Sequence, residues 1–198
     1  MIDSHVHFWR YQATEFPWID ADMAVLQQDF LPADWLAASS DQVTGVVAVQ
    51  ARTSWAENQF LLALAQAEPR VKAVVGWFDF EADVCAQLEL AQTTPLLKGF
   101  RHLIQDEAQP SVYLNTHAGL NQALPRLQAA SYVYEVLVHQ ADLAAAVAFC
   151  QRHDGHYLVI DHMAKTGASA EDVAAFQQRA AGEFLATAGA MGLSTDAA

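Results

Sequence analysis

The sequence has 198 residues, of which 53% are hydrophobic, so the chain can bury one sizeable core without disulfide support. We expect a single domain over residues 1–198. Twenty-three acidic residues against ten basic ones give a net charge of −13, which repels nucleic acid and anionic membrane surfaces at long range. The composition therefore argues against nucleic-acid and membrane partners, and it excludes neither a small anionic substrate nor a homo-oligomer.

Apolar, β-rich runs alternate with amphipathic stretches along the chain. Strands are expected at residues 1–6, 43–50, 73–78, 99–103, 134–139 and 157–162. Helices are expected at residues 31–38, 55–67, 84–90, 115–129 and 141–152. From residue 166 the composition shifts to Ala, Gly, Gln and Thr, where we expect one helix at 170–188 and a disordered tail at 190–198.

The expected fold class is α/β with a parallel sheet. Several strands are nearly continuous apolar segments, such as GVVAV at 45–49 and YLVI at 157–160, as expected when both faces are covered. A barrel or an open doubly wound sheet satisfies this pattern. No Gly-x-Gly-x-x-Gly or Walker loop follows any strand, so nothing supports a nucleotide-binding open sheet.

The two cysteines, Cys85 and Cys150, lie far apart in apolar stretches, which is typical of buried free thiols in a reducing cytoplasm. The N-terminus opens directly into a strand-like segment, without the basic and apolar regions of a signal peptide. No apolar run reaches the ~20 residues that a membrane-spanning helix needs. We therefore expect a cytoplasmic protein.

A His-x-His pair at the end of the first strand is the strongest local signal. In an extended strand, residues two apart project from the same side, so His5 and His7 present two imidazoles to one point. Such a pair can hold a divalent cation or a water, or it can consist of two satisfied polar residues. Three more histidines, His102, His139 and His162, end later strands, and in a parallel barrel such strand ends converge over one mouth.

Arg101 precedes His102, and adjacent side chains of a strand point to opposite faces, so only one of the two can face a barrel interior. Arg101 suits binding of a carboxylate or a polarised carbonyl, or an ion pair with Asp106 or Glu107.

Asp161 is expected to point away from the pocket that His162 faces. Trp9 and Trp77, directly after strands, are candidates for a substrate wall, and Lys165 could place a positive charge at the mouth.

Three segments, IDSHVHFW at 2–9, GFRHLIQDE at 99–107 and VIDHMAK at 159–165, resemble the amidohydrolase superfamily (amidohydrolase-related family 2). Within it they are most similar to the fuconolactonase and 2-pyrone-4,6-dicarboxylate lactonase group. The resemblance covers roughly residues 1–165. It implies a (β/α)8 TIM-type barrel of the metal-dependent hydrolase kind, which hydrolyses the lactone of a sugar acid or a related cyclic ester in carbohydrate metabolism.

The resemblance also implies roles for individual residues. The catalytic positions that it assigns are His5, His7, Arg101, His102, His139 and His162. It makes His5, His7 and His162 the ligands of one divalent metal, with zinc preferred, although some lactonases of this group work without a metal.

The sequence departs from the family in its C-terminal part. The family's general base, an Asp in a Gly-Ser-Asp-Trp-Pro-like segment after the eighth strand, has no match, and Asp196 has no strand before it. Thr166 stands where the family has Pro, and 169–185 resembles the family's C-terminal helix. We therefore expect an incomplete barrel of about six strands, with an atypical helix and tail over 166–198.

Two other functions stay open. One is decarboxylation of an unsaturated or aromatic acid, which is known among amidohydrolase relatives. The other is a truncated, catalytically impaired family member, because an open barrel exposes two parallel edges and loses the base. The Phe100-Arg101-His102 strand end favours the lactonase.

Overall fold

The structure, a computed structural model, describes residues 1–40 and 42–165. Its six strands form one sheet in the order β1-β2-β3-β4-β5-β6, and every neighbouring pair is parallel. The strands are β1 Ile2–Val6, β2 Gly45–Val49, β3 Val71–Trp77, β4 Leu97–His102, β5 Val133–Val136 and β6 Leu158–Ile160. Each of the six predicted strands is present, with ends that differ by a few residues. The helix and tail predicted beyond residue 165 lie outside the described residues.

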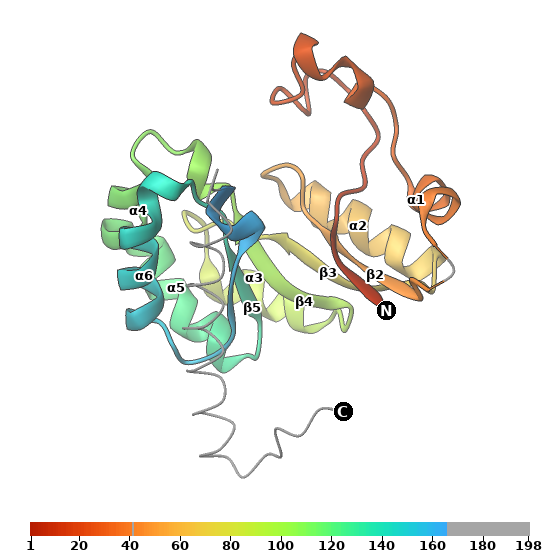
Figure 1. The fold of residues 1–198 in the computed structure, drawn as a ribbon. Helices are drawn as coiled ribbons and strands as arrows, with labels where there is room; N and C mark the ends of the chain where they lie inside the picture. Colours follow the sequence, from red (N-terminus) through yellow and green to blue (C-terminus); the bar gives the residue numbers. More distant parts are fainter. Residues whose placement is uncertain (41, 166–198) are drawn as a thin grey trace, which may run out of the picture.

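Helices alternate with the strands, as predicted, and Figure 1 follows this alternation from red to blue. The helices are α1 Pro32–Ala38, α2 Trp55–Ala67, α3 Val84–Gln92, α4 Pro110–Thr116, α5 Ala118–Ala129 and α6 Leu143–Arg152. Short 3-10 turns are η1 Ala21–Leu26, η2 Ile104–Asp106, η3 Gln140–Asp142 and η4 Asp161–Lys165. The helix predicted at 115–129 is present as α5, which begins three residues later, whereas α4 was not predicted. The chain breaks at His117, whose Nδ1 accepts the N–H of Leu120 and so begins α5.

The sheet is curled. Neighbouring strands lie about 4.8 Å apart, so a flat six-stranded sheet would place β1 about 24 Å from β6. Instead, Nδ1 of His5 in β1 lies 3.9 Å from Oδ1 of Asp161, which follows β6. The described residues therefore form a half-barrel, which confirms the incomplete (β/α) barrel predicted from the sequence.

Two apolar cores support this half-barrel. The main core contains fully buried aromatic side chains, among them Phe78, Phe100 and Phe149. Burial of such a side chain stabilises the fold by roughly 1.5–3 kcal/mol. A smaller core joins Trp9, Phe16, Ile19 and Ala51, and it anchors the segment after β1 that projects beyond the sheet (Figure 1).

The two cysteines are free, as predicted, but Cys85 is exposed on α3 and Cys150 is half-buried. The prediction of two buried thiols is wrong because α3 buries little more than Ala91 and turns Cys85 to solvent. Across residues 1–40 and 42–165, no helix combines the length and the apolar character needed to cross a membrane.

Candidate active site

His5 and His7 meet at the end of β1. Their Nε2 atoms are 3.2 Å apart. The Nδ1 of His7 lies 2.9 Å from the carbonyl oxygen of Val49, the last residue of β2, and donates a hydrogen bond to it. This bond places the proton of a neutral His7 on Nδ1, so that the lone pair of Nε2 faces His5.

Arg101 fixes the tautomer of His5. A guanidinium group can only donate, and Nη1 of Arg101 lies 3.3 Å from Nε2 of His5, so this Nε2 accepts. Burial lowers the pKa of His5 to about 4 and that of His7 to about 3, which leaves both rings neutral near pH 7. Neither Nε2 atom then carries a proton, so no hydrogen bond joins the two rings, and the single lone pair of His5 Nε2 accepts from Arg101.

His162 joins the pair from the end of β6. Its ring is centred 4.6 Å from that of His5, and one ring nitrogen from each of His5, His7 and His162 lies within 4.8 Å of the others. Burial lowers the pKa of His162. The structure thus brings together the three histidines that the resemblance assigns to a metal.

Arg101 lies between the histidines and a buried carboxylate. It is 2% exposed, and its Nη1 donates to Oδ2 of Asp161 at 2.8 Å. Its Nη2 donates to the carbonyl and to the side-chain oxygen of Gln50. The alternative partners considered from the sequence, Asp106 and Glu107, are wrong, because Arg101 faces the interior of the half-barrel.

Asp161 also faces the interior, so the prediction that it points away is wrong. Strand β6 ends at Ile160, and residues 162–165 have positive φ angles between 46° and 60°. The alternation of a strand does not continue through such a left-handed turn. Asp161 and His162 consequently both reach the same cluster.

Glu135 of β5 completes the cluster. It is 5% exposed, and its Oε2 lies 4.0 Å from Nδ1 of His5. Burial and the negative charge of Asp161 raise the pKa of Glu135. Oε2 of Glu135 and Oδ1 of Asp161 are buried without a hydrogen-bond partner among the described residues. His5, Glu135 and Asp161 therefore form a second set of donors that could hold a cation.

His102 points away from this cluster, as alternation along β4 requires. Its Nδ1 accepts from the indole N–H of Trp77 at 3.3 Å, and its Nε2 donates to Oε1 of Glu107 at 2.7 Å. The ring stacks on Tyr113 of α4, with centroids 5.2 Å apart and planes 13° from parallel. Both nitrogens of His102 are therefore occupied.

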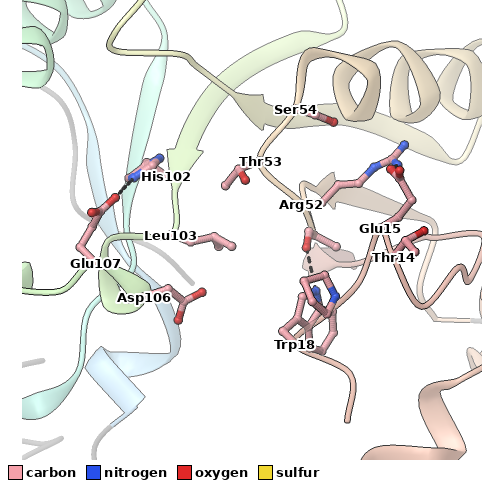
Figure 2. Close-up of a pocket in the computed structure, with 12 residues that line it drawn as sticks. Thr14, Glu15, Trp18, Arg52, Thr53, Ser54, His102, Leu103, Asp106 and Glu107 are labelled. Carbon is pink, nitrogen blue, oxygen red and sulfur yellow. Dashed lines mark hydrogen bonds and ion pairs between the residues drawn. The ribbon is translucent and has the colours of Figure 1, made fainter.

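A cavity of about 510 Å³ opens beside the cluster. Its lining residues come from the segment after β1, from the β2–α2 loop and from the loop after β4: Thr14, Glu15, Pro17, Trp18, Ala51, Arg52, Thr53, Ser54, His102, Leu103, Asp106 and Glu107. Figure 2 shows two walls, with Trp18 and Arg52 on one and His102 and Glu107 on the other. The volume lies in the ~300–1,000 Å³ range of small-molecule sites.

Besides His102, four predicted site residues do not join the cluster. His139 is exposed beyond the end of β5, and Lys165 is exposed at the end of η4. Trp9 is 6% exposed in the smaller core, with its indole N–H bonded to the carbonyl of Gln28 at 2.8 Å. Trp77 lines a second, smaller hollow of about 310 Å³ with side chains of α2 and α3.

Sequence reasoning missed Glu135 and Gln50, and it misplaced Asp161. Glu135 did leave a signal, since it is the only charged residue in the apolar run VYEVLV at 133–138. A charged residue in a buried strand needs partners, and such a residue marks a candidate site. Gln50, which directly follows the apolar strand β2, carries a weaker signal of the same kind.

Residues 2–190 match the family model described as amidohydrolase. A protein of Burkholderia multivorans described as L-fucono-1,5-lactonase is 46% identical over 165 residues, which cover 83% of this chain and 55% of that relative. A protein of Burkholderia ambifaria with the same description is 32% identical over 168 residues, covering 83% and 57%. A crystal structure of an amidohydrolase from Burkholderia multivorans with bound zinc has a TM-score of 0.79 and 44% identity, and covers 91% of this chain and 63% of that chain. The chain thus spans less than two thirds of the length of these relatives.

Proposed function

The chain belongs to the amidohydrolase family, and on this premise we propose that its histidine cluster opens the lactone ring of a sugar acid by attack of water. The two relatives described as L-fucono-1,5-lactonase support this substrate class. One observation carries the proposal: the Nε2 atoms of His5 and His7 lie 3.2 Å apart beside the buried Arg101. In barrels of this kind, catalytic groups lie at the carboxyl ends of the strands.

We further propose that His5 and His7 hold a divalent cation, zinc by preference, with His162 or Asp161 as a further ligand. The spacing of the donors fits, because two nitrogens each 2.0–2.1 Å from a tetrahedral zinc are roughly 3.3 Å apart. The lone pair of His5 Nε2 would then bind the cation in place of the Arg101 N–H. The bond from His7 to the Val49 carbonyl is the kind of outer contact that orients a metal-binding imidazole. When bound, such a cation would lower the pKa of water and polarise a carbonyl group.

The chain's own residues set the charge of the site. Asp161 holds Arg101 in place, and the guanidinium is a fixed positive charge that can stabilise negative charge on the lactone carbonyl oxygen. In the reaction, the water oxygen bonds to the carbonyl carbon and the ring C–O bond breaks. One water proton ends on the released hydroxyl, and the new acid loses the other.

The proton-accepting carboxylates of the cluster, within the described residues, are Asp161 and Glu135. The eighth-strand Asp that the family uses as its base has no counterpart among them. We also propose a cytoplasmic location, which the free cysteines support, and a homo-oligomer stays a prediction.

The test is acid release from L-fucono-1,5-lactone by the zinc-loaded chain in a pH-stat, after subtraction of spontaneous hydrolysis. We expect release above this blank and a loss of about 100-fold or more in His5→Asn and His7→Asn. His156→Asn is the matched control, because this ring lies against Tyr157, outside the cluster, with the two ring planes tilted by 56°.

Three outcomes would change the proposal. Full activity of metal-stripped protein would remove the metal from it. A folded, zinc-loaded chain that releases no acid from sugar lactones would overturn the function and favour an impaired family member. Release of CO2 from an unsaturated acid would favour the decarboxylase alternative.

A further inference from the structure

We propose that the cavity between Trp18, Arg52 and Glu107 binds the hydroxyl-bearing part of a neutral, sugar-like ligand, and that its acidic lining disfavours dicarboxylate lactones. This inference rests on the proposed lactone hydrolysis and deepens it. It names the substrate class and the residues that select it.

Two pairs of adjacent residues place the cavity next to the histidine cluster, although no residue of the cluster lines it. Gln50 bonds Arg101 in the cluster, while the next residue, Ala51, lines the cavity. Arg101 itself faces the cluster, while His102 lines the cavity. The proposed ligand would place its carbonyl at the cluster and its remaining groups in the adjoining cavity.

Trp18 gives the cavity an aromatic wall. Its indole N–H bonds the carbonyl of Ala51 at 3.0 Å, which fixes one edge of the ring, and the side chain stays 37% exposed. The face of an aromatic ring carries partial negative charge and attracts the partly positive C–H groups of a pyranose ring. A ring anchored by its edge, as in Figure 2, is well placed for this contact.

Glu107 gives the opposite wall an oriented acceptor. Its Oε1 takes the hydrogen bond from His102, and its side chain is 34% exposed. Because His102 also accepts from Trp77, it has no nitrogen left for a ligand and acts as a positioning residue for Glu107. The carboxylate can accept a ligand hydroxyl in a charge-assisted hydrogen bond.

The charges of the lining oppose an anionic ligand. Glu15, Asp106 and Glu107 are acidic, and Arg52 is the only cation that lines the cavity among the described residues. Arg52 is already paired with Glu15 and with the buried Glu57. These acidic side chains would therefore repel a second carboxylate on the ligand, and no unpaired cation of the lining would offset the repulsion. Neutral ligand hydroxyls, in contrast, can donate hydrogen bonds to the same carboxylates.

The chain offers a matched control for Glu107. Glu81 pairs with Nε2 of His117, and His117 stacks on the same Tyr113 as His102, with centroids 4.3 Å apart. Glu81 is 80% exposed and does not line the cavity. The substitution Glu81→Gln thus repeats the chemistry of Glu107→Gln away from the proposed subsite.

The test measures binding of two stable probes by NMR titration: methyl L-galactopyranoside and the matching methyl L-galactopyranosiduronate, which adds one carboxylate. We expect the uronate to bind at least about tenfold more weakly to the wild type. Glu107→Gln should weaken binding of the neutral glycoside about tenfold, the scale of one charge-assisted hydrogen bond. Trp18→Ala should weaken it by removing the aromatic face, and Glu81→Gln should leave it unchanged. His102→Gln, which keeps a donor for Glu107, should retain binding that His102→Phe loses.

Any of three results would overturn the inference. They are equal effects of Glu107→Gln and Glu81→Gln on glycoside binding, uronate binding as tight as that of the glycoside, and no glycoside binding. The readout separates it from the proposed function. If the chain binds the glycoside but does not hydrolyse lactones, the proposed subsite stands and the proposed reaction is refuted. If the chain hydrolyses lactones and the KM is unchanged in Glu107→Gln and Trp18→Ala, the proposed reaction stands and the proposed subsite is refuted.

Discussion

Replacing Arg101 by methionine should strongly destabilise the fold. The side chain is 2% exposed and bonds Asp161 at 2.8 Å. Removal of one member of a buried ion pair leaves the other charge uncompensated, which costs about 3–5 kcal/mol. This is a large fraction of the ~5–15 kcal/mol that separates a folded domain from its unfolded state.

Urea denaturation followed by tryptophan fluorescence measures this loss. With a denaturant slope of about 2 kcal/mol per molar urea, a loss of 4 kcal/mol lowers the midpoint by about 2 M. Arg70→Met is the control, because Arg70 is exposed and surface substitutions usually change stability by less than about 0.5 kcal/mol.

A double-mutant cycle isolates the ion pair. Asp161→Asn alone should also lower the free energy of unfolding. The double variant of Arg101→Met and Asp161→Asn should lose less stability than the sum of the two single losses, because each single variant already breaks the same ion pair. A midpoint shift below about 0.3 M for Arg101→Met, or costs that simply add, would refute the buried pair.

Other predictions concern the supporting structure and the metal. Asn58→Ala should lower the free energy of unfolding by about 2–4 kcal/mol in urea denaturation, because its side chain bonds the N–H and the carbonyl of Trp77 at 2.7 and 2.8 Å. Gly76→Ala should cost less stability in the Asn58→Ala variant than in the wild type, because a Cβ added at Gly76 would lie 2.5 Å from Oδ1 of Asn58. If the costs of the two substitutions simply add, this contact is absent. Burial lowers the pKa of His153, so its titration followed by NMR should have a midpoint below the ordinary value of about 6.5. The free energy of unfolding should then fall as the pH falls below about 6.5. A titration midpoint above about 6.5 would contradict the lowered pKa. Zinc at 100 times its Kd should stabilise the wild type by about 2.7 kcal/mol in thermal unfolding, and an equal effect on His7→Asn would place the metal elsewhere.

The strands could be predicted because parallel strands covered on both faces are nearly continuous apolar runs. Strand β2 lies wholly inside the predicted range 43–50. Strand β5, however, ends at Val136, three residues before the prediction, although Leu137 and Val138 are buried. Apolar sequence reports burial, and it does not report where strand pairing stops.

The break between α4 and α5 could not be predicted from periodicity. Apolar residues continue with helical spacing across His117, and the break depends on a side-chain cap from its imidazole. Histidine is an uncommon helix cap compared with Ser, Thr, Asp or Asn, so the local sequence gives little sign of it.

The candidate site was predictable in part. The His5 and His7 pair follows from the two-residue repeat of a strand. Asp161 does not, because residues 162–165 adopt positive φ angles without a single glycine. Such a conformation costs roughly 1–2 kcal/mol per residue and is imposed by the surrounding structure, so no local pattern predicts it.

Arg101 and His102 show how one strand end can serve two compartments. Alternation along β4 sends Arg101 into the half-barrel and His102 outward, to Tyr113 and the cavity. From sequence alone both residues are candidate catalytic groups, but their contacts assign Arg101 to the histidine cluster and His102 to Glu107. A lactone that spans both compartments would place its carbonyl at Arg101 and its hydroxyls toward Glu107. The alternation of β4 would then set the orientation of the substrate. Two neighbouring residues would divide the tasks, with Arg101 at the reacting carbonyl and His102 positioning the Glu107 that selects the substrate.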